Sequence, residues 1–347
     1  MDRQTADEKL RSKIKTELQR SKNSNSINLP RDFYFTEEGN RLTMTFSSRK
    51  GVGLAEKPDN MQNNVAAFEG WAAALYVHYL HRNGMICLNV NFDLPLQQKE
   101  DEPHGLYKKY PHYSRFLYRA LRFSRKYAGW FCLSDNLIPQ VASFERYLNN
   151  NRFVNNVPKG EAGINQNLEC TIENRFAEEP TLLEEWIGKG NKLHRQLPTG
   201  LFRDSVSENN RIFPSRKSAI DLWALDHDTL KVIELKANNK MVGALTELFF
   251  YTNYVNDMFA DADSSFKPAG PSAASSRGYA CLFECPESGR LRKIKKTAGY
   301  LLLDRQSCHP LIDTEVLDVL SGGKNGISYE CIKYDLGLRV YKCESIA

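Results

Sequence analysis

The sequence predicts an α/β fold in two domains, and three features of the chain lead to this prediction. Runs typical of strands alternate with amphipathic helical patterns along the chain. The length of 347 residues is greater than that of a usual single domain. A polar, turn-rich stretch at 149–160 separates two parts of the pattern. We therefore expect a charged N-terminal tail (1–26), an α/β domain (27–160) and a second α/β domain (161–347) with a central mixed sheet flanked by helices.

The overall composition is ordinary for a soluble globular protein, with 41% hydrophobic and 26% charged residues. The formal net charge of +5 is mildly basic, which is compatible with a nucleic-acid partner without requiring one. The eight cysteines form no C-x-x-C pair, so we expect reduced thiols in a cytoplasmic protein, and neither a zinc site nor a disulfide framework. No apolar run approaches the length of a membrane span, and residues 1–26 lack the apolar stretch of a signal peptide.

The first domain is expected to contain two strands and a core-packing helix. Residues 41–46 and 85–92 have strand character, and 64–80 carries apolar residues at helical spacing. The stretch 97–112 contains two prolines and a glycine, which predicts a loop. Before this domain, the mixed charges of residues 5–20 indicate either an exposed helix or a disordered segment.

A basic stripe is predicted on the next helix, over 113–131. Its basic residues recur along one face, among aromatic and aliphatic residues, and are Arg115, Arg119, Arg122 and Lys126. Such a stripe can follow the phosphate backbone of a nucleic acid. The alternative is a solvated basic face opposite an apolar face that packs on the core. A further short helix is expected over 143–149.

The second domain is expected to begin with helices over 168–176 and around 182–186. A loop-rich stretch at 189–217 follows and contains many basic residues, among them Arg211, Arg216 and Lys217. A stretch of this kind beside an active site can contact a phosphate backbone, and a solvated loop is the alternative.

The stretch 220–254 is the most informative part of the chain. Two short apolar runs, 220–226 and 230–237, are separated by a polar turn and followed by a helical pattern from about 242 to 255. Charged residues are rarely buried unless they are paired or coordinate an ion. Both runs nevertheless contain them, namely Asp221, Glu234 and Lys236.

Strand periodicity places Glu234 and Lys236 on one face of the sheet. With a two-residue turn at 228–229, Asp221 lies opposite Lys236 and joins this face, whereas a three-residue loop would move it to the other face. The other face would carry apolar residues that pack against helices, namely Leu222, Ala224, Ile233 and Leu235.

Two carboxylates and an ammonium on an otherwise apolar surface suit a hard divalent cation, because Mg²⁺ takes oxygen ligands and often uses protein carboxylates together with substrate phosphate. Such an ion lowers the pKa of a bound water and stabilises charge on a phosphate. A neighbouring lysine can position that water or hold a phosphate oxygen. The alternative is a structural ion pair of Lys236 with Asp221 or Glu234.

Asp221, followed by Glu234-Leu235-Lys236 on the next strand and then by a helix, resembles the core of the PD-(D/E)XK nuclease superfamily. That superfamily includes many restriction endonucleases and the RecB-like exonucleases. The resemblance covers roughly residues 168–254 and implies a restriction-endonuclease-like fold for the second domain. The chain departs from the family pattern before the aspartate, where Ile220 takes the place of proline and Pro214 lies seven residues upstream.

The resemblance also implies roles for individual residues. Asp221 and Glu234 would bind the metal, and Lys236 would serve the attacking water. On the following helix, Glu247 and Tyr251 are similar to the Gln-x-x-x-Tyr element of the RecB-like branch, with Glu in place of Gln. Related nucleases often place a further glutamate on a helix before the aspartate strand; the candidates, of which the first is favoured, are Glu169, Glu173, Glu184 and Glu185.

The remainder of the chain is expected to complete the sheet. Residues 261–278 predict a flexible loop, and 290–296 is a basic run that either contacts nucleic acid or forms a solvated hairpin tip. A short helix is expected over 314–320. Further strands are expected over 279–283, 299–303, 327–334 and 338–343.

These observations favour a metal-dependent nuclease, expected to be an endonuclease, that hydrolyses phosphodiester bonds with DNA as the favoured partner. Asp221 and Glu234 would hold Mg²⁺ or Mn²⁺, with the carbonyl of Leu235 as a further ligand. Lys236 would orient or deprotonate the attacking water, and Glu247 would support the site. Cutting both strands of a duplex would be easiest for a homodimer. The alternatives are a nucleic-acid-binding protein on a nuclease-like scaffold without activity, and a regulatory protein that uses Lys236 in a structural pair.

Overall fold

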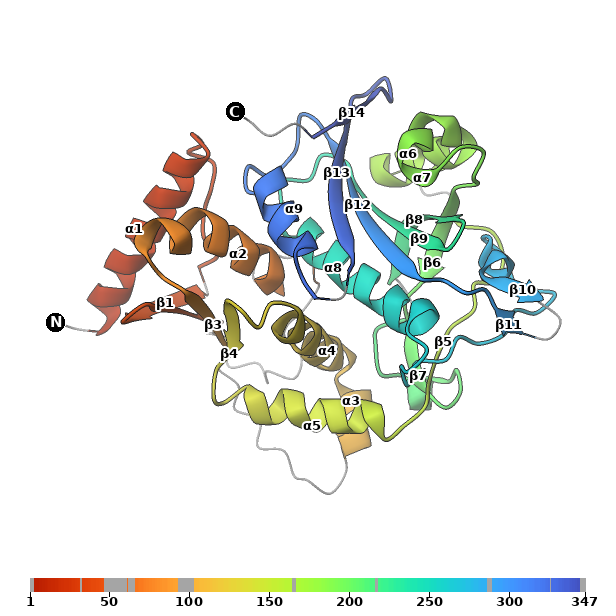
Figure 1. The fold of residues 1–347 in the computed structure, drawn as a ribbon, viewed down its shortest axis with the longest axis horizontal. Helices are drawn as coiled ribbons and strands as arrows, with labels where there is room; N and C mark the ends of the chain where they lie inside the picture. Colours follow the sequence, from red (N-terminus) through yellow and green to blue (C-terminus); the bar gives the residue numbers. More distant parts are fainter. Residues whose placement is uncertain are drawn as a thin grey trace.

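The computed structural model describes residues 3–31, 33–46, 61, 66–92, 103–163, 167–215, 218–285, 289–324 and 326–343. These residues form helices and mixed sheets, so the predicted α/β class is confirmed. Figure 1 shows a smaller sheet with its helices on one side, a six-stranded sheet on the other, and helix α8 (Gly243–Val255) between them. Among the described residues, no helix is both long enough and apolar enough to span a bilayer.

The N-terminal half contains a four-stranded sheet. Its strands, in spatial order, are β1 (Phe33–Glu38), β2 (Arg41–Phe46), β3 (Cys87–Phe92) and β4 (Phe131–Leu133). β1 and β2 form an antiparallel hairpin, whereas β2, β3 and β4 run parallel to one another. The strands predicted at 41–46 and 85–92 are therefore confirmed.

The helices of this half are α1 (Arg3–Ser21), α2 (Phe68–Leu75), the π-helical continuation η3 (Tyr76–Leu80), the short 3-10 helix η4 (His81–Asn83), α3 (Pro103–Lys109), α4 (Pro111–Lys126) and α5 (Ile138–Asn149). In the charged N-terminal segment, the helical alternative is confirmed, and α1 buries Ile14 and Leu18 against the core. The helix predicted over 64–80 is present from Phe68 onward, and the one predicted over 143–149 begins earlier, at Ile138.

Two expectations for the N-terminal half are wrong. The stretch 97–112, predicted as a loop, contains α3 and the start of α4, while residues 97–102 lie outside the described residues. Each of the two prolines is the first residue of a helix. At this position the backbone N–H has no partner within the helix, so proline, which lacks the N–H, loses no hydrogen bond there. The helix predicted over 113–131 ends at Lys126, and Phe131 begins β4.

The C-terminal half is built on the six-stranded sheet, whose strands in spatial order are β14 (Val340–Lys342), β13 (Ser328–Tyr334), β12 (Lys296–Asp304), β9 (Thr229–Lys236), β8 (Ala219–Asp226) and β6 (His194–Pro198). β6, β8 and β9 are antiparallel neighbours. β12 runs parallel to both β9 and β13, and β14 is antiparallel to β13. The sheet is therefore mixed, as predicted.

The other elements of this half are shorter. Two small two-stranded sheets pair β5 (Phe153–Asn155) with β7 (Leu201–Arg203) and β10 (Phe283–Cys285) with β11 (Arg290–Leu291). The helices are α6 (Leu168–Glu178), η5 (Pro180–Leu183), α7 (Glu184–Ile187), η6 (Glu208–Asn210), η7 (Asn256–Ala260), η8 (Tyr279–Leu282) and α9 (Thr314–Ser321).

Most predictions for the C-terminal half are confirmed, including the helix at 314–320 and the strands at 299–303 and 327–334. The strand predicted over 279–283 is wrong, because η8 occupies 279–282 and only Phe283 belongs to a strand. Gly278 precedes this turn with a φ of 76°, a left-handed conformation that ends any extended segment. A short apolar run does not distinguish a strand from a tight helical turn.

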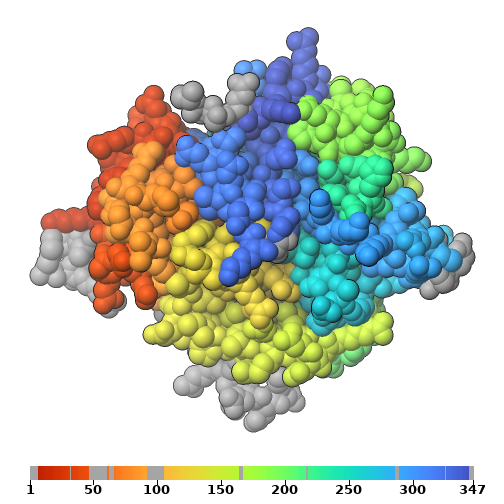
Figure 2. All heavy atoms as spheres, in the orientation of Figure 1, coloured from red at the N-terminus to blue at the C-terminus, as the bar shows by residue number. Residues whose placement is uncertain are grey.

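Apolar packing is continuous between the two halves. One large cluster joins buried side chains of α1, α2, α4, α8 and α9, and a smaller cluster lies on the opposite face of the six-stranded sheet. Figure 2 shows α2 and α4 meeting α9 on one face of the molecule. There Tyr127, directly after α4, donates a hydrogen bond to the carbonyl of Leu320 at 2.6 Å. The domain boundary near residue 160 stays a prediction.

A buried ion pair links α2, α4 and α8. Arg119 of α4 donates from Nε to Oε1 of Glu69 at 2.7 Å and from Nη2 to Oε2 of the same residue. Arg119 also donates to the carbonyl of Ala66, and Thr246 of α8 donates to Oε2 of Glu69 at 3.1 Å. Both charged side chains are 1% exposed. Removing one partner of such a pair leaves the other charge buried without compensation.

Replacing Arg119 with methionine is expected to lower the free energy of unfolding by ~3–5 kcal/mol, because the Glu69 carboxylate loses its cation in a site that water does not reach. Urea unfolding followed by circular dichroism measures this change.

The matched control is Arg125→Met on the same helix. Arg125 pairs with Glu145 at the surface, where its side chain is 57% exposed, so the expected loss is less than ~1 kcal/mol. Equal losses in the two variants would contradict the structural role assigned to Arg119.

Candidate active site

The hairpin of β8 and β9 positions the charged residues that the sequence singles out. Its turn is His227-Asp228, one residue earlier than expected, and His227 has a left-handed φ of 53°. The register therefore differs from the expectation by two residues, and a shift of two preserves the face to which each side chain points. Asp221 accordingly lies on the face of Glu234 and Lys236, and Asp221 and Glu234 line the same cavity.

The opposite face of the hairpin is apolar, as predicted. Leu222, Ala224, Ile233 and Leu235 are fully buried in the smaller apolar cluster, together with side chains of α6 and α7. The charged residues alternate with these apolar residues along the strands, so they point to the other face of the sheet. Helix α8 packs against that charged face.

Lys236 is the centre of the charged cluster. Its Nζ lies 2.5 Å from Oε1 of Glu234, 3.1 Å from Oε2 of Glu247 on α8 and 3.6 Å from Oε1 of Glu169 on α6. Glu234, Lys236 and Glu247 are all at most 3% exposed. Asp221 completes the cluster, and its Oδ2 accepts a hydrogen bond from the backbone N–H of Leu235 at 3.0 Å.

The electrostatics of this cluster follow from burial and from an excess of carboxylates. Burial raises the pKa of Asp221 to about 7, with Lys236 opposing the rise and Glu169 adding to it. Burial and the charge of Asp221 raise the pKa of Glu234 well above its ordinary value. Burial alone would lower the pKa of Lys236, but Glu234 and Glu247 outweigh it and raise that pKa. The site therefore favours the approach of a further positive charge.

Of the four candidate upstream glutamates, Glu169 is the one that reaches the cluster. Helix α6 begins at Leu168 because the side chain of Asn167 caps it by accepting from the N–H of Cys170 at 2.7 Å. This places Glu169 in the first turn, where Oε2 accepts from the N–H of Ala237 at 3.4 Å. The other candidates bind elsewhere: Glu173 to Arg195 and Gln196, Glu184 to the N–H of Gly190, and Glu185 to Lys342.

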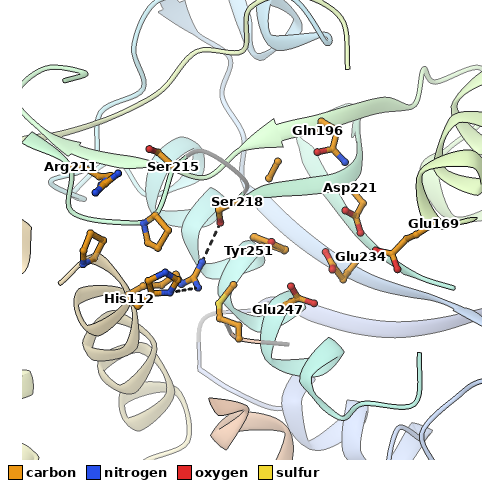
Figure 3. Close-up of a pocket in the computed structure, with 15 residues that line it drawn as sticks. His112, Glu169, Gln196, Arg211, Ser215, Ser218, Asp221, Glu234, Glu247 and Tyr251 are labelled. Carbon is orange, nitrogen blue, oxygen red and sulfur yellow. Dashed lines mark hydrogen bonds between the residues drawn. The ribbon is translucent and has the colours of Figure 1, made fainter. Parts of the chain in front are cut away.

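A cavity of about 630 Å³ opens above the cluster. Figure 3 shows Glu169, Asp221, Glu234 and Glu247 together on one wall, with Tyr251 beside them. Residues that the sequence analysis did not identify also line the cavity, among them His112, Gln196 and Ser218. They come from separate segments with no shared motif, so no pattern in the sequence could have found them.

The donor types fit a hard divalent cation, although the described residues contain no preformed group of three or more His, Cys, Asp or Glu side chains that could hold a metal. The fit rests on two observations. Among the described residues, Oε2 of Glu234 is buried without a hydrogen-bond partner, and carboxylates outnumber cations around it. A buried carboxylate oxygen without a partner is costly unless an ion or water satisfies it. The residues that would bind such a cation are Asp221, Glu234 and the carbonyl of Leu235.

The predicted basic stripe on α4 is mostly internal, which corrects the expectation of an exposed face. Arg119 is paired with Glu69, Arg122 lies 2.6 Å from Asp257, and Lys126 packs its Nζ over the ring of Tyr329 at 4.6 Å. Arg119 and Lys126 are at most 5% exposed. The ion pairs of Arg119 and Arg122 therefore stabilise the packing of α4 against its neighbours.

The remaining basic residues of the prediction differ in position. Arg115 lines the cavity, with Nη1 donating to Oγ of Ser218 at 3.3 Å. Arg211 also lines the cavity and pairs with Glu208 at 2.6 Å. Arg216 and Lys217 lie outside the described residues. The structure thus brings Arg115 and Arg211 to the candidate site.

Comparison of the chain with protein-family models, with curated proteins and with solved structures finds no match. The assignment of this site therefore depends on its own geometry and chemistry.

The Nζ of Lys126 makes no hydrogen bond among the described residues, and burial lowers its pKa to about 7. Lys126→Met is expected to raise the free energy of unfolding near neutral pH by ~1–3 kcal/mol, because the buried ammonium is removed and the apolar packing is kept. Lys126 keeps its proton up to a higher pH in the unfolded chain than in the folded chain. The free-energy cost of burying Lys126 therefore falls as pH rises.

The difference in stability between Lys126→Met and wild type should therefore shrink between pH 7 and about pH 9.5, as measured by urea unfolding across that range. A variant that is less stable than wild type at pH 7, or a difference that does not change with pH, would contradict a net cost of burying this ammonium.

Proposed function

We propose that the protein is a metal-dependent nuclease that hydrolyses phosphodiester bonds, with DNA as the favoured substrate. The observation that carries this proposal is that Asp221 and Glu234 line one cavity together with Glu169 and Glu247, and that Lys236 contacts three of these carboxylates. Carboxylate oxygens are the ligands of hard divalent cations, and a neighbouring ammonium suits the attack of water on a phosphate.

The order of elements around the site supports the proposal. Helix α6, which carries Glu169, precedes the strand of Asp221; the strand of Glu234 and Lys236 follows directly, and then helix α8. This is the arrangement that the resemblance to the PD-(D/E)XK superfamily implies for a restriction-endonuclease-like domain. The parallel strand β12 beside β9 extends the sheet beyond the hairpin.

Each residue has a role that its position supports. Asp221 and Glu234, with the carbonyl of Leu235, would hold Mg²⁺ or Mn²⁺. The bound cation would supply charge stabilisation at the phosphate and would lower the pKa of water in the site. Lys236 would orient the attacking water with an ammonium that Glu234 and Glu247 hold in place. The low exposure of these groups keeps bulk water from screening their charges.

A second candidate is a nucleic-acid-binding or regulatory protein on the same scaffold, without catalytic activity. One specific observation favours it: Nζ of Lys236 lies 2.5 Å from Oε1 of Glu234, so an internal ion pair already satisfies part of the carboxylate. This candidate requires no divalent cation for folding or binding.

Cleavage of supercoiled plasmid, linear duplex and single-stranded DNA, with Mg²⁺, Mn²⁺ or EDTA, tests the proposal. Wild type is expected to cleave only with a divalent cation. Asp221→Asn and Lys236→Met are each expected to lower the rate by ~100-fold or more, because one removes a ligand charge and the other removes the group that orients the water.

The matched controls are Asp228→Asn, in the turn of the same hairpin, and Lys342→Met, on β14. Each variant removes one partner of an exposed ion pair and should leave the rate unchanged. The melting temperature of each variant separates a loss of activity from a loss of fold. Wild-type rates in both Asp221→Asn and Lys236→Met would rule out the proposed mechanism.

A further inference from the structure

The cavity of the candidate site has two walls of opposite charge. The acidic wall belongs to the C-terminal half and is described above. The facing wall is basic and comes from two other segments: His112 and Arg115 at the start of α4, and Arg211 in the loop before β8. Figure 3 shows His112 and Arg211 on the side of the cavity away from Glu169 and Glu234.

Arg115 is held rigidly on the basic wall. Its Nη1 donates to Oγ of Ser218 at 3.3 Å, and its Nη2 lies 3.3 Å from Nδ1 of His112. The guanidinium also stacks over the ring of Phe250 on α8, 5.5 Å from the ring centre, and the residue is 4% exposed. A guanidinium fixed in this way presents its planar donors in one direction, which suits a phosphate oxygen.

The shape of the cavity restricts what can reach the acidic wall. Glu234 is 1% exposed and Glu247 is 3% exposed, so a substrate must enter the cavity to contact them. A volume of about 630 Å³ is within the range of sites that take a small molecule, which is roughly the scale of one or two nucleotides. A recessed site of this volume suits an unpaired strand, whose nucleotides can enter it individually, as flipped bases enter the pockets of base-modifying enzymes.

We propose that the cavity takes a single-stranded segment of nucleic acid, with a phosphate next to the reacting one bound by Arg115 and Arg211. This inference rests on the proposed function, and it assigns a substrate class and a phosphate-binding wall to that site. It also assigns a role to the N-terminal half, because α4 of that half supplies Arg115 and His112 to the cavity.

Equilibrium binding in EDTA tests the inference without any cleavage. The probe is a fluorescently labelled DNA of about ten nucleotides, offered as a single strand or as a blunt duplex of the same sequence. Wild type is expected to bind the single strand about tenfold more tightly than the duplex. Arg115→Gln is expected to lose about tenfold in affinity for the single strand, since a charge-assisted hydrogen bond is removed.

Arg211→Gln provides a second variant that does not disturb a buried side chain, because Arg211 is 25% exposed. It should weaken single-strand binding several-fold and reduce the slope of log K against log salt by about 0.7, as expected for one lost phosphate contact. The matched control is Arg125→Gln, which should leave binding unchanged because Arg125 is 57% exposed, pairs with Glu145 and does not line the cavity.

A neutral methylphosphonate at single positions of the strand separates a direct contact from a structural effect. Wild type should lose about tenfold in affinity at one position, and Arg115→Gln should lose nothing further there. Equal affinity of wild type for strand and duplex, or unchanged binding by a folded Arg115→Gln, would overturn the inference. Single-strand preference in a protein that never cleaves would contradict the nuclease assignment alone, whereas cleavage without this preference would contradict only the inference.

Discussion

The buried ion pair of Arg119 and Glu69 holds together α4 and α8, two helices that contribute to opposite walls of the cavity. Arg119 lies one helical turn after Arg115 on α4, so the ion pair that fixes Arg119 also fixes the position of Arg115. Thr246, which donates to Glu69, directly precedes Glu247 on α8, so the same pair also positions the Glu247 side of the acidic wall. The pair lies inside continuous apolar packing, where a lost partner would not be replaced by water. The site is thus an assembly of both halves of the chain.

At the centre of the site, several carboxylates are buried around one ammonium, an arrangement that lowers the stability of the folded state. Lys236 is shared among Glu234, Glu247 and Glu169, while Asp221 accepts a hydrogen bond from a backbone N–H. Within the part of the chain that the structure describes, Oε2 of Glu234 has no hydrogen-bond partner. Burying more carboxylates than cations raises the pKa of Asp221 and Glu234, which weakens the folded state. Such an arrangement is typical of sites that bind a cation or perform acid–base chemistry. The apolar face on the other side of the same strands secures the hairpin in the sheet.

The local parts of this account could be predicted from sequence, and the non-local parts could not. The alternation of side chains along 220–226 and 230–237 predicts both the hairpin and its charged face, because this pattern is carried by residues that are neighbours in the sequence. The predicted turn position is wrong by one residue. Asp221 still lies on the predicted face of the sheet, because this error shifts the pairing register by two residues and a shift of two leaves each side chain on the same face. The basic stripe of α4 was misjudged because its partners, Glu69 and Asp257, are distant in sequence. The same limit applies to Gln196 and Ser218, which reach the cavity through the fold alone.

The central claim is that Asp221 and Glu234 form a binding site for a divalent cation. Anomalous diffraction from crystals equilibrated with Mn²⁺ would test it most directly, because it locates the ion without reference to any activity. The account predicts a peak ~2–2.5 Å from carboxylate oxygens of both residues. It also predicts that Asp221→Asn abolishes the peak. A site without Mn²⁺ at saturating concentration would contradict the account.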